Sequence, residues 1–380
     1  MKRNGRTSKP RLSESSRDSE RDERIARALV KWFRANARDL PWREITEAGT
    51  RDAYRSLVSE FMLQQTQVSR VIEKFAPFLE RFPTIQELAN ADENVVLGAW
   101  SGLGYYRRAR LLHAAAKEIV RNHDGRVPSN ARTLREITGI GAYTAGAISS
   151  IVFQEREPLA DGNVARVTLR LDAVQDASPS TPAVMKRVWK RATELIQTPT
   201  GSTQPGALNE AMMELGATVC TPKGPSCSTC PVSAECVSRR EGVQHLIPLA
   251  KSAMKKKPVV MLSVAIVDSN GRMLLEQRDD KGMWAGLWQS PTFETSGNFS
   301  PSVEAALLAQ AQEALGLSAR LSVIERFHHA TTHRDVTVIV AKANIKRKTI
   351  GEREWFDAES IAELGISNAQ RRVMDIARGS

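Results

Sequence analysis

The sequence predicts two domains of different class, an all-α domain over residues 25–240 and an α+β domain over residues 259–380. Three observations support this division. A chain of 380 residues is too long for one ordinary core. Apolar residues recur at helical spacing in the first part, whereas VVMLSVAIV, a turn at 268–271 and MLLEQR form a β-hairpin pattern in the second. Residues 241–258, with three consecutive lysines, are expected to form the linker.

Composition favours a soluble protein that binds a polyanion. The sequence is 41% hydrophobic and 26% charged, with a net charge of +11 and a pI near 9.7, which favours nucleic acid as a partner. No apolar run approaches the roughly 18 residues that a membrane span requires, and the N-terminus lacks the apolar core of a signal peptide. We therefore expect a cytoplasmic protein with no membrane association. Residues 1–24 are rich in charged residues and serine, which predicts a disordered basic tail.

A helix predicted over residues 51–70 carries the first candidate catalytic group. Its apolar residues form one face, and Glu60, within SEFMLQQTQ, lies at the edge of that face. Burial there would raise the pKa of the carboxyl, as a proton donor near neutral pH requires. Gln65 and its neighbouring glutamines carry amides that suit hydrogen bonds to base edges.

Two glycine-containing turns suggest contact with DNA. Segment 102–110 combines a glycine turn, Tyr105 beside a second tyrosine, and three arginines, which suits phosphate contact with an aromatic wedge in the base stack. Predicted helices flank the turn at Gly139 and Gly141, where the backbone can approach a phosphate. Further on, Asp161 lies in a loop where its carboxylate can face a ligand. The alternative is an ordinary helical hairpin with a solvated aspartate.

The cysteines form one cluster in the sequence. Cys220, Cys227, Cys230 and Cys236 follow the spacing C-x6-C-x2-C-x5-C. Four thiolates suit either zinc or an iron-sulfur cluster, and disulfides are disfavoured in a reducing compartment. Upstream of the cysteines, TPTGSTQPG at 198–206 is predicted to be a flexible linker.

These motifs together resemble the helix-hairpin-helix DNA glycosylase superfamily and, within it, the adenine glycosylase branch called the MutY family. The resemblance implies a helix-hairpin-helix domain whose four cysteines hold a [4Fe-4S] cluster. It also implies that Lys223 and Arg239 meet phosphate, and that a monomer binds double-stranded DNA with adenine opposite 8-oxoguanine or guanine. The motifs that carry it are LPWR at 40–43, SEFMLQQTQV around Glu60, GLGYY at 102–106, the turn at 139–144, DGNV at 161–164 and the four cysteines.

The resemblance implies a role for each matching residue. Glu60 would protonate the adenine leaving group and then activate water, and Asp161 would stabilise the oxocarbenium-like sugar. Tyr143 and Asn163 would orient these groups; because a tyrosine cannot form the Schiff base of a lyase, a monofunctional hydrolase is implied. The implied substrate contacts are Trp42, Arg43 and Glu210 around the flipped adenine, Gln65 and Tyr105 in the base stack around the opposite lesion, and Gly139 and Gly141 in the hairpin.

The α+β domain resembles the Nudix fold. A Nudix catalytic box needs several carboxylates on one helix to hold metal, and the matching segment 309–316 retains one. The resemblance therefore implies recognition of 8-oxoguanine without pyrophosphate hydrolysis. The family's lesion-reading Phe-Ser-His falls at residues 331–333, which makes Thr332 and His333 candidate lesion contacts but leaves no aromatic side chain there.

Three other functions remain open. An endonuclease III-like glycosylase-lyase is disfavoured by Tyr143 and by the second domain. A non-catalytic iron-sulfur damage sensor is disfavoured by the presence of both Glu60 and Asp161. A Nudix hydrolase with a DNA-binding extension would require metal-dependent turnover of nucleoside triphosphates. The favoured function is adenine excision in a bacterial cytoplasm, with the protein associated with the nucleoid when bound to DNA.

Overall fold

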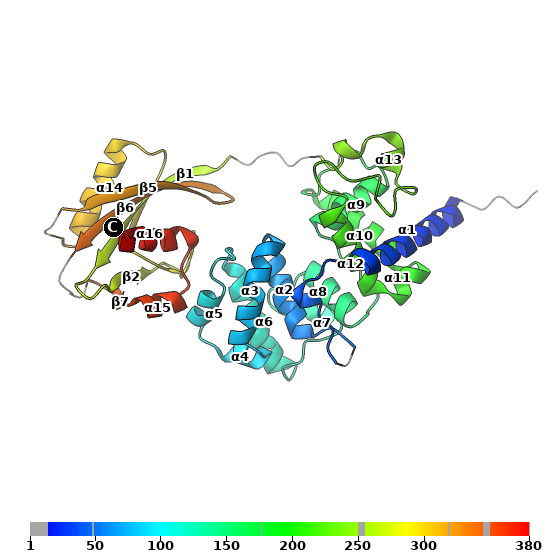
Figure 1. The fold of residues 1–380 in the computed structure, drawn as a ribbon, viewed down its shortest axis with the longest axis horizontal. Coiled ribbons are helices and arrows are strands. Elements are labelled where there is room, and N and C mark those ends of the chain that lie inside the picture. The colour runs from blue at the N-terminus through cyan, green and yellow to red at the C-terminus, as the bar shows by residue number, and fades with distance from the viewer. Residues whose placement is uncertain are drawn as a thin grey trace, which may run out of the picture. The chain divides into compact units, whose positions relative to one another are not determined.

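The chain folds into two compact units (Figure 1). The computed structural model describes residues 14–47, 49–175, 177–249, 255–317, 320–344 and 350–379. Unit 1 comprises residues 1–60 and 126–251, and unit 2 comprises residues 61–125 and 252–380. The chain therefore enters unit 2, returns to unit 1 and enters unit 2 again. None of the described helices combines the length and apolarity needed to cross a bilayer.

Unit 1 is helical, and its core lies where α1, α9 and α12 pack together. Ile25 and Leu29 of α1, Val164 of α9 and Leu208 of α12 belong to one buried cluster. The elements are α1 (Glu14–Asn36), η1 (Pro41–Arg43), α2 (Ala53–Leu63), α7 (Ala131–Glu136), α8 (Ala142–Ala147), η2 (Ile148–Val152), α9 (Gly162–Leu171), α10 (Pro182–Ile196), α11 (Pro199–Thr203), α12 (Pro205–Thr218), α13 (Val237–Glu241) and η3 (Gln244–Leu246).

Two segments of unit 1 are more ordered than the sequence predicted. The prediction of disorder for residues 1–24 is wrong over 14–24, which form the start of α1; residues 1–13 lie outside the described residues. The linker predicted at 198–206 is also wrong, because α11 and the start of α12 occupy it. Thr198 caps α11 by accepting a hydrogen bond from the Gly201 amide at 3.0 Å, and a proline follows at the first helical position.

The helix predicted over 51–70 is interrupted. α2 ends at Leu63, in unit 2, and α3 begins at Val68, because Gln65 between them has a φ of 55°, outside the helical range. The buried guanidinium of Arg108 donates to the carbonyls of Phe61 (2.9 Å) and Met62 (2.8 Å) and thereby satisfies carbonyls at the end of α2. Arg108, one of the three arginines expected to contact phosphate, therefore caps α2 instead.

Unit 2 combines helices with a mixed sheet. β1 pairs in parallel with β6, while the other strand pairs are antiparallel, in the order β3-β2-β1-β6-β5 with β4 on β1 and β7 on β2. Its elements are α3 (Val68–Arg81), α4 (Ile85–Asn90), α5 (Glu93–Ala99), α6 (Arg107–Asn122), β1 (Lys257–Val267), β2 (Met273–Gln277), β3 (Trp288–Gln289), β4 (Thr292–Ser296), α14 (Pro301–Ala314), β5 (Ser322–Ala330), β6 (Arg334–Asn344), β7 (Glu354–Phe356), α15 (Ala358–Glu363) and α16 (Asn368–Gly379).

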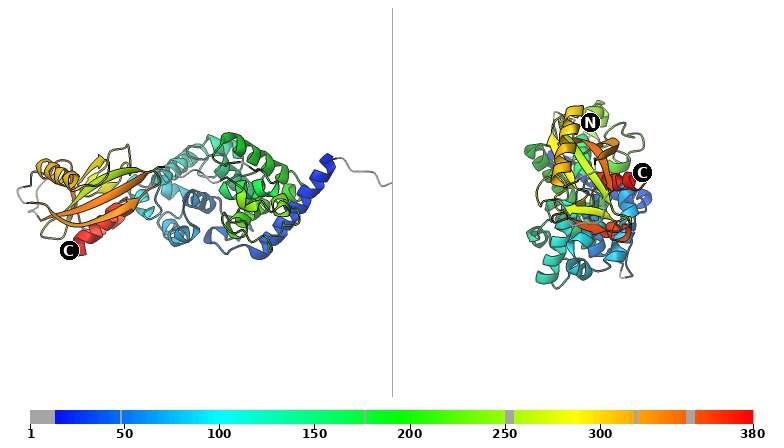
Figure 2. Two further views of the ribbon diagram at one scale, coloured as in Figure 1. Left: turned by 90° about the horizontal axis from the view of Figure 1, so that it is seen from above. Right: turned by 90° about the vertical axis from the view of Figure 1, so that its left-hand side faces the viewer.

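Alternation along β1 distributes its side chains between two helices. Val260 and Leu262 lie in a buried cluster with Leu307 of α14, whereas Met261 lies in a cluster with Val373 of α16. The two helices consequently cover opposite faces of the sheet (Figure 2). The predicted hairpin is present, with Val267 opposite Met273, and β1 begins two residues before the strand expected from Val259.

Candidate active site

Glu60 is a buried carboxyl of unit 1. It lies on α2 with 8% of its surface exposed, and its Oε2 atom has no hydrogen-bond partner among the described residues. Burial, reinforced by the charges of Glu210 and Asp161, raises its pKa to about 7, although a hydrogen bond with Tyr143 acts in the opposite direction. Glu60 can therefore hold a proton near neutral pH, as a general acid must.

Asp161 begins α9. Its Oδ1 accepts a hydrogen bond from the Val164 amide at 2.7 Å, and its Oδ2 accepts one from Asn163 Nδ2 at 3.0 Å. Burial raises the pKa of Asp161, while these hydrogen bonds act in the opposite direction. The carboxylate is thus fixed at a helix N-terminus, in a largely desolvated position where a nearby positive charge would be strongly stabilised.

Tyr143, on α8, lies close to both acids. Burial is the main cause of its raised pKa, and the charges of Glu60 and Asp161 contribute next. The hydroxyl therefore keeps its proton and can donate to Glu60; it also lies 3.4 Å from Met213 Sδ. Unit 1 thus brings Glu60, Tyr143, Asp161 and Asn163 into one electrostatic environment.

The residues expected around adenine lie in a buried ion-pair network. Glu210 Oε1 is 3.0 Å from Arg43 Nε, and Glu210 Oε2 is 2.8 Å from Arg51 Nη2. Arg43 also reaches Glu214, which pairs with Arg38 at 2.6 Å. Sequence reasoning missed Arg51, Arg38 and Glu214, since no motif distinguished them from other charged residues. Trp42, in η1, is 8% exposed.

Arg166 is a further residue that the sequence did not reveal. It lies one helical turn after Gly162 on α9 and donates from Nη2 to Asn163 Oδ1 (2.9 Å) and the Gly216 carbonyl (2.7 Å). Its Nε donates to the Cys220 carbonyl at 2.7 Å. One guanidinium therefore connects the residue beside Asp161 to the first cysteine. The signal available in the sequence was an arginine placed among the apolar residues of a predicted helix.

Gly216 allows α12 to approach Asn163. A Cβ added at Gly216 would lie 2.6 Å from Asn163 Cβ, so Gly216→Ala is expected to displace Asn163 and destabilise the protein by about 1–3 kcal/mol. Urea denaturation of the variant and the wild type measures this loss of stability. Gly162→Ala is the control for stability, because an added Cβ there meets no atom within 4 Å. Equal stability of the two variants would contradict the packing argument.

The raised pKa of Glu60 predicts how stability depends on pH. The contribution of this carboxyl to the free energy of unfolding is about 3 kcal/mol. It is complete below about pH 4.5 and is lost as the pH rises through about 7. Glu60→Gln does not titrate, so its stability relative to the wild type should increase by about that amount from pH 4 to pH 8. Urea denaturation at both pH values tests this. Glu73→Gln, at an exposed position, serves as control. If the difference in stability between Glu60→Gln and the wild type were the same at both pH values, the raised pKa of Glu60 would be contradicted.

The four cysteines of unit 1 line one cavity, together with apolar residues such as Val167 and Leu215. All four are free, and Cys236 Sγ lies 3.5 Å from the Arg170 carbonyl. Burial first, and then the other three sulfurs, raise the pKa of Cys230 to about 11. Cationic iron or zinc would be needed to keep such thiols deprotonated. Across the described ranges, no group of three or more His, Cys, Asp or Glu side chains is placed so that it could hold a metal ion.

The hairpin glycines differ in conformation. Gly139 has a φ of 87°, which favours glycine, whereas Gly141 has a φ of −85° and serves as the N-cap of α8. Backbone conformation therefore favours glycine at Gly139 but not at Gly141, and the approach of this turn to a phosphate stays a prediction.

Unit 2 brings two predicted substrate contacts together. The Tyr105 hydroxyl lies 2.7 Å from Thr332 Oγ1, and the Tyr105 side chain is 47% exposed. His333 is exposed beside Thr332, in the turn between β5 and β6. Gln65 is also exposed, in the turn after α2. Of the two tyrosines in GLGYY, only the first is available for a ligand, since the Tyr106 hydroxyl is buried and donates to the Ile366 carbonyl at 2.6 Å.

Comparison with known proteins identifies a family for each of two segments of the chain. Residues 58–194 match the HhH-GPD superfamily of base excision DNA repair proteins, and residues 263–375 match the NUDIX domain. A thermostable thymine-DNA glycosylase of known structure is 22% identical, with a TM-score of 0.51 over 59% of this chain and 99% of that one, which shows a shared fold.

Relatives in several kingdoms cover most of the chain. The human adenine DNA glycosylase is 33% identical over 410 residues, which span 93% of this chain and 73% of the human protein. The Buchnera aphidicola (subsp. Schizaphis graminum) enzyme of that name is 26% identical across 93% of this chain and 98% of its own. The Arabidopsis thaliana one is 37% identical, and its match covers 71% of this chain but 47% of the plant protein. The chain therefore belongs to the adenine DNA glycosylase family.

Proposed function

We propose that this protein hydrolyses the N-glycosidic bond of adenine mispaired with 8-oxoguanine or guanine in double-stranded DNA. The observation that carries the proposal is the pairing of a buried, protonatable Glu60 with an Asp161 carboxylate fixed at the start of α9, both close to Tyr143. Two carboxyl groups on either side of a glycosidic bond are the usual arrangement for its cleavage. Since unit 1 of one chain supplies all these groups, the site is complete in a monomer.

Each acid has a separate task in the proposed reaction. Glu60 donates its proton to a ring nitrogen of adenine as the C–N bond breaks, so that neutral adenine leaves and Glu60 becomes a carboxylate. Asp161 stabilises the positive charge that develops on the sugar. The Glu60 carboxylate then accepts a proton from water as the water attacks the sugar carbon. Tyr143 offers a hydroxyl and not an amine, so no Schiff base forms and the strand is left intact.

Single-turnover release of adenine tests the proposal. Duplexes with adenine opposite 8-oxoguanine, guanine or thymine should be cleaved at rates that fall in that order, with the thymine duplex essentially inert. Borohydride should trap no efficient covalent adduct. A protein that releases adenine from none of the duplexes, or that is trapped efficiently, would contradict a monofunctional adenine glycosylase.

Recognition of the lesion is proposed to involve Tyr105 and Thr332. Tyr105 is half exposed and hydrogen-bonded to Thr332, so an aromatic wedge and a polar group of the β5–β6 turn can contact the same base. Segment 309–316 on α14 retains one carboxylate, Glu313, which supports binding of the oxidised base without pyrophosphate hydrolysis. Thr332→Ala is the direct test, because it should reduce the preference for 8-oxoguanine over guanine while cleavage opposite guanine is maintained.

The cysteine loop, which we define as residues 220–236, is proposed to hold a [4Fe-4S] cluster. Four thiols around a common, largely apolar cavity fit this group, whose iron would keep the thiolates charged. Its chemistry here would be structural, and Lys223 and Arg239 in or beside the loop would contact DNA phosphate.

Metal analysis distinguishes the cluster from zinc. We expect protein purified without oxygen to contain iron and acid-labile sulfide in nearly equal amounts, because four cysteine sulfurs line the cavity. Cys227→Ser should lose most of this iron, measured by elemental analysis, whereas Ser233→Ala, at a non-cysteine residue lining the same cavity, should retain it. Stoichiometric zinc without sulfide would contradict the cluster.

A further inference from the structure

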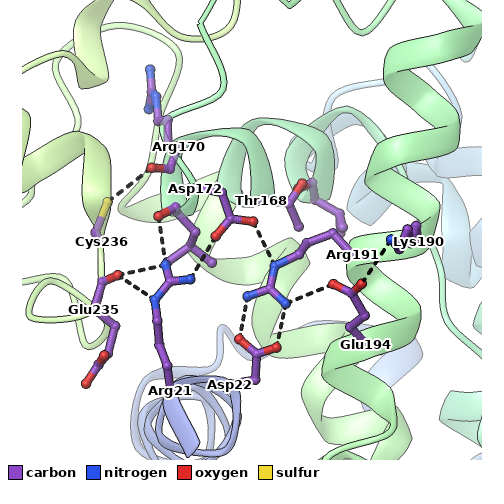
Figure 3. Close-up of polar contacts among 12 residues, drawn as sticks. Arg21, Asp22, Thr168, Arg170, Asp172, Lys190, Arg191, Glu194, Glu235 and Cys236 are labelled. Atoms are coloured by element: carbon purple, nitrogen blue, oxygen red, sulfur yellow. Dashed lines mark hydrogen bonds and ion pairs between the residues drawn. The ribbon is translucent and has the colours of Figure 1, made fainter. Parts of the chain in front are cut away.

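Four consecutive residues of α1 contact separate segments of unit 1. We call residues 21–24 the N-terminal anchor; Figure 3 shows the contacts of Arg21 and Asp22. Asp22 accepts a hydrogen bond from Arg191 on α10 at 2.6 Å, and Glu23 accepts one from the Thr200 amide at 3.0 Å. Arg21 and Arg24 both reach Glu235, in the cysteine loop. The anchor therefore joins α10, the start of α11 and the cysteine loop to one helix.

Polar contacts hold this end of α1. A cavity of about 850 Å³ is lined by Arg21 and Asp22 of α1, Thr168 of α9 and Arg191 of α10. Apolar packing resumes at Ile25, which is fully buried. Because polar contacts hold residues 21–24, the position of this part of α1 relative to the cysteine loop depends on the hydrogen bonds of the anchor.

Arg21 has the most extensive contacts of the four. Its Nη2 donates to the Leu171 carbonyl and to the Glu235 carbonyl, each at 2.9 Å, and its Nη1 is 3.0 Å from Asp172 Oδ1. Leu171 ends α9, where carbonyls lack helical partners and a positive charge is favourable. The planar guanidinium bridges these three acceptors with donors held in a fixed fork, a geometry that the compact ammonium of lysine lacks.

The contacts of Arg21 lie next to a cysteine. Glu235 immediately precedes Cys236, whose Sγ lies 3.5 Å from the Arg170 carbonyl oxygen (Figure 3). At the end of α9, Arg21 thus contacts the Leu171 carbonyl, and Cys236 contacts the neighbouring Arg170 carbonyl. Fixing the Glu235 carbonyl to the same helix end restricts the main chain that carries the Cys236 sulfur.

We propose that Arg21 is a positioning residue for the metal cluster, which it secures by holding the main chain of Glu235 against the end of α9. This inference rests on the proposed cofactor. Without Arg21, the segment that carries Cys236 opens more often, and each opening exposes a ligand bond to solvent and chelator. Arg21 therefore slows cluster loss without contributing a ligand.

The test compares cluster loss from full-length, cluster-loaded proteins. Arg21→Gln is expected to lose visible absorbance and release iron to a chelator about 10-fold faster than the wild type, since charge-assisted hydrogen bonds are lost at a partly buried site. Arg21→Lys, which retains charge but not the fork, should lose iron at an intermediate rate. Circular dichroism before chelation checks that each variant is folded, so that slow opening is separated from global unfolding.

Two variants on the same helix are matched controls. Arg24→Gln removes an ion pair to the Glu235 carboxylate, at 2.7 Å, from a side chain that is 47% exposed, and leaves the Glu235 carbonyl with Arg21. Arg27→Gln changes an exposed arginine further along α1. Both should lose iron at the wild-type rate. Loss from Arg21→Gln at the wild-type rate, or equal acceleration in Arg24→Gln, would overturn the inference. Wild-type protein that contains no iron and sulfide would instead overturn the cofactor itself.

Discussion

Replacing Glu60 with glutamine is expected to slow adenine release by about 10²- to 10⁴-fold, the usual contribution of general acid-base catalysis. The amide keeps the size of the side chain but has no acidic proton to donate to the leaving base. Single-turnover release from a duplex with adenine opposite 8-oxoguanine measures the loss. Binding of the same duplex should change little, because Glu60 is buried and its role begins when the bond breaks.

The pH profile separates a proton donor from a structural carboxyl. With a pKa of about 7, Glu60 is increasingly deprotonated above neutrality, so the wild-type rate should fall as the pH rises from 7 to 9. The residual rate of Glu60→Gln should not follow that decline. A variant that releases adenine as fast as the wild type would remove Glu60 from the mechanism.

Replacing Asp161 with asparagine is expected to reduce the rate by at least about 10²-fold, as the loss of one preorganised electrostatic group does in other enzymes. Asparagine caps helices about as well as aspartate, so the hydrogen bond to the Val164 amide can persist while the negative charge is lost. The free energy of unfolding should therefore change little, and single-turnover release beside urea denaturation measures both quantities.

Asp161→Ala serves as the comparison. Alanine removes both the charge and the cap, so stability should fall by about 0.5–2 kcal/mol in addition to the loss of rate. If Asp161→Asn were as destabilised as Asp161→Ala, the rate change could not be assigned to charge. If Asp161→Asn retained the wild-type rate, the sugar cation would not depend on Asp161.

Local patterns were sufficient for much of the fold. The amphipathic helix from Ile25, the β1–β2 hairpin and the helix near residues 303–315 follow from periodicity and turn residues, and the family fold is confirmed. The predictions that failed depended on distant contacts. Residues 14–24 read as a polar tail, yet several of their charges have partners more than 150 residues away.

The same distinction applies to the candidate site. Glu60, Asp161 and the cysteines were found because they occur in compact motifs. Arg51 and Arg166 carry no motif, and their roles depend on Glu210, Asn163 and other partners that only the folded chain brings close. Arg108 shows the opposite error: an arginine beside tyrosines resembled a phosphate contact, but it is buried against main-chain carbonyls.

The Arg21–Glu235 contact spans 214 residues of sequence, and it therefore constrains how the newly made protein matures. At roughly 5–20 residues per second, the ribosome needs on the order of ten to forty seconds to complete that interval. During translation, the apolar side of α1 lacks its packing partners until the later helices of unit 1 have been made. Insertion of the proposed cluster can therefore become secure only after nearly two-thirds of the polypeptide has been synthesised.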